Sequence, residues 1–124
     1  MRKSHFLLLS LIFFSACAPE YTGHISSTSP DGKNIIDVTE EMQAANDPDV
    51  FWQHVSVRSA SVAKPIVPGN VAVYSCHSHP VITWESNTEA RLEINMSDVG
   101  QSFKAPPKPK SINGVSIIFT INAK

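Results

Sequence analysis

The stretch SINGVSIIFTIN, residues 111–122, shows the alternation that decides the fold. Successive side chains of a β-strand point to opposite faces of its sheet. Every second residue of this stretch is a bulky apolar one, and these residues share one face: Val115, Ile117, Phe119 and Ile121. The pattern predicts a strand whose apolar face lies in a core.

Four stretches upstream of it also have the character of strands. VFWQHVSVR (50–58) alternates, and NVAVYSC (70–76) is rich in β-branched and aromatic residues. PVITW (80–84) and EARLEINM (89–96) flank the short polar segment ESNT (85–88), which suits a hairpin turn. Five strands separated by turn signals predict a mainly β domain, a small β-sandwich or an open barrel.

Two further segments complete the predicted domain, which spans residues 35–124. Asp37 and Glu40 have the spacing of a capping box, so we expect one short N-terminal helix over 38–46, ended by Pro48. A helix lying across one sheet would make the domain α+β, which is the alternative. The prolines of KAPPKPK (104–110) lack amide donors and predict an extended linker or an edge crossing.

The N-terminus indicates where the chain works. Arg2 and Lys3 precede an apolar run from Phe6 to Phe14, and small residues follow it. This order is typical of a secretory signal peptide. The run is about half the roughly 20 residues that a membrane-spanning helix needs.

The four residues FSAC (14–17) resemble the lipobox of bacterial lipoproteins, with Ser15 and Ala16 as the small residues before the cysteine. The class usually has leucine where Phe14 stands. The resemblance implies that residues 1–16 are removed and that acyl chains on Cys17 anchor the protein in a membrane. Ala18 is not aspartate, the residue that retains such lipoproteins in the inner membrane, so the resemblance implies the periplasmic face of the outer membrane. The alternative is an ordinary signal peptide.

Residues 17–34 follow as a segment rich in Ser, Thr, Gly and Pro. Such a composition has few side chains to bury, so we expect a lipidated N-terminus and a flexible tether. Removing residues 1–16 leaves 108 residues, enough for one domain, and moves the formal charge from −1 to −3. A negative charge without a basic patch argues against a nucleic-acid partner.

The stretch VAVYSCHSHPVITW, residues 71–84, carries the candidate reactive side chains. His77 and His79 share a face and are weak candidates for a metal site, but two ligands are fewer than zinc requires. Cys76 points away from them, so we predict no nucleophile, no metal and no cofactor. The alternative for both histidines is a solvated turn beside Pro80. Cys76 is expected to be a buried thiol or to form an intermolecular disulfide.

Two functions are consistent with these observations. The first is a structural or assembly lipoprotein of the cell envelope, such as a component of a secretion, conjugation or pilus machine, with a protein partner and no enzymatic activity. The second is a small inhibitor or binding lipoprotein. VYSC (73–76), PVITW and EARLEI (89–94) look like the opening strands of the lysozyme-inhibitor lipoproteins, which are β-barrels. The inhibitory loop and second cysteine of that family are absent, so no site residue is transferred.

Overall fold

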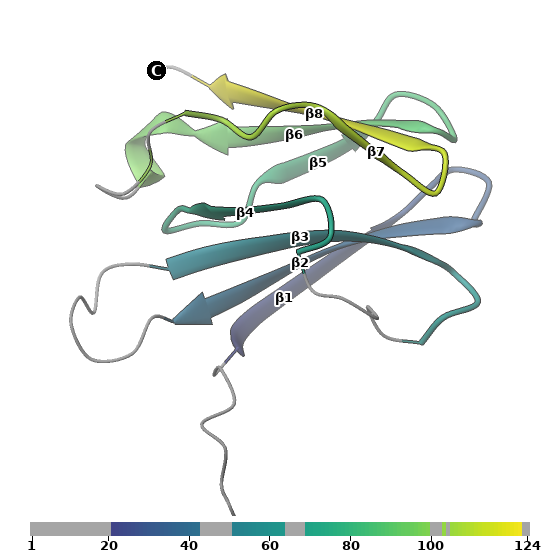
Figure 1. The fold of residues 1–124 in the computed structure, drawn as a ribbon, viewed down its shortest axis with the longest axis horizontal. Coiled ribbons are helices and arrows are strands. Elements are labelled where there is room, and N and C mark those ends of the chain that lie inside the picture. The colour runs from purple at the N-terminus through teal and green to yellow at the C-terminus, as the bar shows by residue number, and fades with distance from the viewer. Residues whose placement is uncertain (1–20, 43–50, 64–68, 100–102, 104, 123–124) are drawn as a thin grey trace, which may run out of the picture.

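The computed structural model describes residues 21–42, 51–63, 69–99, 103 and 105–122. Their strands form two four-stranded sheets, which lie one above the other in Figure 1. The first sheet is antiparallel throughout, in the order β1 (Tyr21–Thr28), β2 (Asn34–Met42), β3 (Phe51–Ser59) and β4 (Ala72–Ser75). The mainly β prediction is therefore confirmed.

The second sheet has the order β5-β6-β8-β7. In it β6 and β8 run parallel, and the other pairs are antiparallel. A single turn of 3₁₀-helix, η1 (Met96–Asp98), follows β6. The strands of this sheet are β5 (Val81–Trp84), β6 (Glu89–Asn95), β7 (Lys110–Ile112) and β8 (Val115–Asn122).

One hydrophobic core joins the two sheets. Alternate residues of β2, β3 and β4 face alternate residues of β6 and β8, as the predicted alternation requires. Val115 and Ile117 are fully buried and Phe119 is nearly so, whereas Ile121 is half-buried. The buried apolar residues are Ile36, Val38, Val55, Val57, Val71, Tyr74, Cys76, Ala90, Leu92, Ile94, Val115, Ile117 and Phe119.

The expected helix over 38–46 is wrong for the part that the structure describes. Residues 38–42 belong to β2, which is paired with both β1 and β3. Ile36 and Val38 are buried and separated by Asp37, which is the two-residue period of a strand. Pairing on both sides thus overrides a capping-box spacing that stabilises only a short helix. Residues 43–46 lie outside the described residues.

The predicted tether is also wrong over much of its length, because β1 occupies residues 21–28. It pairs with β2 through a turn in which Ser29 and Asn34 are joined by a backbone hydrogen bond of 2.8 Å. Gly32 takes a positive φ of 73° there. The Ser29 hydroxyl and the Lys33 amide donate to Asp31 and hold the pKa of this carboxyl below its usual value. An edge strand is held mainly by backbone hydrogen bonds to its neighbour. A segment of polar composition can therefore still form one.

The described residues therefore form eight strands where five were expected. The additional ones are β1, β2 and β7. Strand β7 begins at the last residue of the proline-rich segment and turns into β8 through Asn113 and Gly114. Both have positive φ, 52° and 74°, as a two-residue type I′ hairpin turn requires.

Candidate functional site

The stretch 71–84 does not gather its reactive side chains. Cys76 is 2% exposed and belongs to the core, on the same side of its strand as Tyr74. The Tyr74 ring makes edge contacts with Phe103 and Phe119, and burial raises the pKa of its hydroxyl well above the usual range. A thiol in these surroundings has the environment of an inert buried cysteine rather than of a nucleophile.

His77 and His79 face different surroundings, although they are two residues apart. His77 is exposed, and its ring meets the Phe51 ring edge-on at 6.0 Å. His79 is half-buried, and its Nδ1 lies 3.0 Å from Oε1 of Gln53. The alternative of a solvated turn thus describes only His77. Among the described residues, no group of three or more His, Cys, Asp or Glu side chains could hold a metal ion.

The contacts of Gln53 fix the proton on His79. Gln53 is completely buried, and its Nε2 donates to Oε2 of Glu40 at 2.9 Å and to the carbonyl of Cys76 at 3.1 Å. Both partners are acceptors, so the amide orientation is determined and Oε1 must accept. His79 therefore donates from Nδ1. This network ties the segment after β4 to β2 and β3, and its groups satisfy one another.

A second polar cluster lies on the outer face of the first sheet, and sequence reasoning did not find it. Asp37 is completely buried there, and its two oxygens meet Nε of Arg58 at 2.6 Å and Nε2 of His24 at 3.0 Å. Nearby, Nε2 of His54 lies 2.5 Å from Oε2 of Glu41. These residues come from β1, β2 and β3. These contacts join three strands and occupy the carboxylates, as a structural role requires, and Arg58 with Asp37 forms a buried ion pair.

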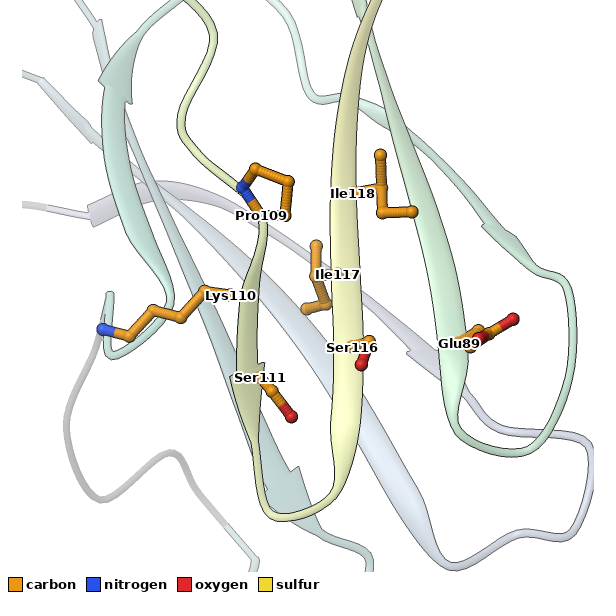
Figure 2. A pocket seen from close by; sticks show the side chains of 7 residues that line it. All are labelled: Glu89, Pro109, Lys110, Ser111, Ser116, Ile117 and Ile118. Carbon is orange, nitrogen blue, oxygen red and sulfur yellow. The ribbon is translucent and has the colours of Figure 1, made fainter.

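One shallow hollow of about 390 Å³ lies beside the β7–β8 hairpin (Figure 2). Ile118 is half exposed in it. The Lys110 side chain points away from Ile118 and Glu89, and its amine donates to the carbonyl of Asn70 at 2.7 Å. The hollow therefore brings no nucleophile and base together. Its lining residues are Glu89, Pro109, Lys110, Ser111, Ser116, Ile117 and Ile118.

Comparisons with known proteins give no relative: no protein-family model, no curated protein and no solved structure matches this chain. The predicted lipidation residue Cys17 lies outside the described residues. Within them, no helix is long and apolar enough to cross a membrane.

Proposed function

We propose that this protein is an outer-membrane lipoprotein, anchored through Cys17 and facing the periplasm, that serves as a structural or assembly component of an envelope machine. The observation that carries the proposal is the start of β1 at Tyr21, four residues after Cys17. A folded sheet begins where a long tether was expected. Acyl chains on Cys17 would therefore hold the domain itself close to the membrane, in a fixed place from which it can bind a partner.

The edge strand β1 supports a protein partner. Its eight residues, YTGHISST, include no Lys, Arg, Asp, Glu or Pro. Natural proteins use charges and prolines to prevent edge strands from pairing with other chains. The β7 edge of the second sheet has both devices, because β7 contains Lys110 and follows three prolines. The β1 edge, with eight residues, is longer than the four-residue edges β4 and β5 and is suited to accept a strand from a partner.

The first test is a Cys17→Ser variant expressed in the native cells. We expect it to lose labelling by a clickable fatty acid and to leave the outer-membrane fraction, because the acylated thiol is gone. Ser10→Ala, a small change in the apolar run outside the lipobox residues 14–17, is the matched control for processing. Unchanged labelling of Cys17→Ser would reject the anchor.

The second test separates the assembly role from the inhibitor role. A photo-crosslinking residue at position 26 on β1 reports on the edge, and one at position 120 on β8 is the control. An adduct with a subunit of a multiprotein envelope complex, formed from position 26 and not from position 120, supports an assembly component. An adduct with a single muramidase would favour the inhibitor instead.

A further inference from the structure

One end of the molecule collects side chains from both sheets, and we call it the N-terminal rim: Met42, Phe51, His77 and Met96. Met42, the last residue of β2, pairs with Phe51, the first residue of β3. The Phe51 carbonyl accepts from the Cys76 amide at 3.1 Å, and the next amide, of His77, donates to Asp98 in η1 at 2.6 Å. In Figure 1 this is the left-hand end, where β1 begins and where β2, β6 and β8 finish.

Two large apolar side chains of the N-terminal rim are exposed. Met42 is 39% exposed, and Met96, which opens η1, is 49% exposed. Phe51 is half-buried, with His77 against its ring. Long, flexible methionine side chains adapt to irregular apolar surroundings. These two side chains leave the rim with apolar surface that water does not favour.

Among the described residues near the N-terminal rim, three carboxylates have polar partners. Glu41 meets His54 at 2.5 Å, Glu40 accepts from Gln53 at 2.9 Å, and Asp98 accepts from Ser78 at 2.7 Å. Gln53 and Ser78 are neutral donors, so Glu40 and Asp98 keep their charges, and contact of the rim with a membrane depends on its exposed apolar side chains.

The length of chain before β1 indicates what covers this surface. Only three residues separate Cys17 from Tyr21, and Tyr21 pairs with Glu41, the neighbour of Met42. A fully extended chain spans at most about 3.6 Å per residue, so Cys17 lies within about 14 Å of the start of β1. An acylated Cys17 sits at the headgroup level of the membrane. The end of the domain at which β1 begins, which includes Met42, then lies near the bilayer.

We propose that the N-terminal rim is a membrane-contact surface, in which Met42 and Met96 enter the boundary between phospholipid headgroups and acyl chains. The inference rests on the proposed anchor at Cys17. The acyl chains and the rim hold the domain at two points. Two points of contact fix its orientation on the membrane, whereas the lipid anchor alone does not. The turns at Ser29–Asn34 and Asn113–Gly114, at the other end of the strands, then face away from the membrane (Figure 1).

The two tryptophans of the chain allow a direct test. Trp52 follows Phe51 of the rim, whereas Trp84 is the last residue of β5 and points to Ser27 on β1. Trp84→Phe leaves Trp52 as reporter, and Trp52→Phe leaves Trp84. The acylated full-length protein is placed in phosphatidylcholine vesicles whose acyl chains carry bromine, which quenches nearby tryptophan fluorescence. We expect Trp52 to be quenched more than Trp84.

The decisive variant is Met42→Gln with Met96→Gln, made in the Trp52 reporter. We expect the excess quenching of Trp52 over Trp84 to be lost. Val73→Gln with Ile118→Gln is the matched control. Both residues are at least about as exposed as Met42 and Met96, but they lie on the outer faces of the sheets. Equal quenching of the two tryptophans, or an excess that survives the methionine changes, would overturn the contact surface in a protein shown by mass to be acylated. A mass without acyl groups would instead reject the anchor, and the contact surface with it.

Discussion

The buried carboxylate of Asp37 gives the sharpest test of how the first sheet is held together. Oδ2 of Asp37 accepts from Nε of Arg58 at 2.6 Å, and Oδ1 lies 3.0 Å from Nε2 of His24. The Asp37 side chain is completely buried. Asp37→Asn keeps the shape but removes the charge, and its amide group turns a donor toward one of the two partners. Arg58, whose side chain is only 14% exposed, then keeps a positive charge without its counterion.

The expected cost follows from these exposures. Removing one partner of a fully buried ion pair costs about 3–5 kcal/mol. Arg58 keeps some contact with solvent and a hydrogen bond to the Val62 carbonyl, so we expect about 2–4 kcal/mol. For a domain of roughly 100 residues, this lowers the melting midpoint by about 8 °C or more. Urea and thermal unfolding followed by tryptophan fluorescence measure both quantities.

Two comparisons decide whether the reasoning about Asp37 is right. Asp31→Asn makes the same chemical change in an exposed turn, and we expect its midpoint to stay close to the wild type. Asp37→Leu with Arg58→Met removes both charges, so it should be more stable than Asp37→Asn alone. Equal midpoints for the two Asp→Asn variants would refute the ion-pair explanation, as would a double variant that is less stable than Asp37→Asn.

Two further predictions concern the core and the histidines. Phe119→Ala should cost about 3–5 kcal/mol because it leaves a cavity between the sheets; Thr120→Ala, on the opposite face of β8, should cost much less, and equal losses in urea unfolding would contradict the register. His79→Ala should cost about 1–3 kcal/mol because it leaves Oε1 of Gln53 buried without a donor. The exposed His77→Ala should change the free energy of unfolding by about 0.5 kcal/mol or less, and a larger loss at His77 than at His79 would reverse the assignment.

The strands that the sequence predicts correctly are those whose side chains carry the information. Gln53, Val55 and Val57 are buried on one face of β3, as their alternation indicates. The missed strands depend on information that side chains do not carry. Strand β1 has a polar composition and is held by backbone pairing to β2. Strand β7 is hidden by the prolines before it, although Asn113-Gly114 is a strong hairpin signal that could have located it.

The polar clusters show the same limit. Asp37 meets Arg58 only because the register of β2 and β3 places Asp37 opposite Ser56, next to Arg58 on the same face. No local pattern determines that register. As a strand, IIDV (35–38) places Asp37 on the face opposite the core residues Ile36 and Val38. A carboxylate there, when buried, needs a charged partner. The helix expected over 38–46 gives no reason to expect Asp37 to be buried.

The pairing of these charges also bears on where the proposed partner would bind. On the outer face of the first sheet, Asp37 is matched by Arg58 and His24, and Glu41 by His54. A partner that bound this face through its own charges would have to separate these pairs, and the desolvation involved offsets much of the gain. Strand addition at β1 uses backbone groups, along an edge without Lys, Arg, Asp or Glu, and does not require these side-chain pairs to separate. In the proposed orientation, with the N-terminal rim on the membrane, the β1 edge would run from the bilayer toward the periplasm and would be open to an extended segment of the proposed partner.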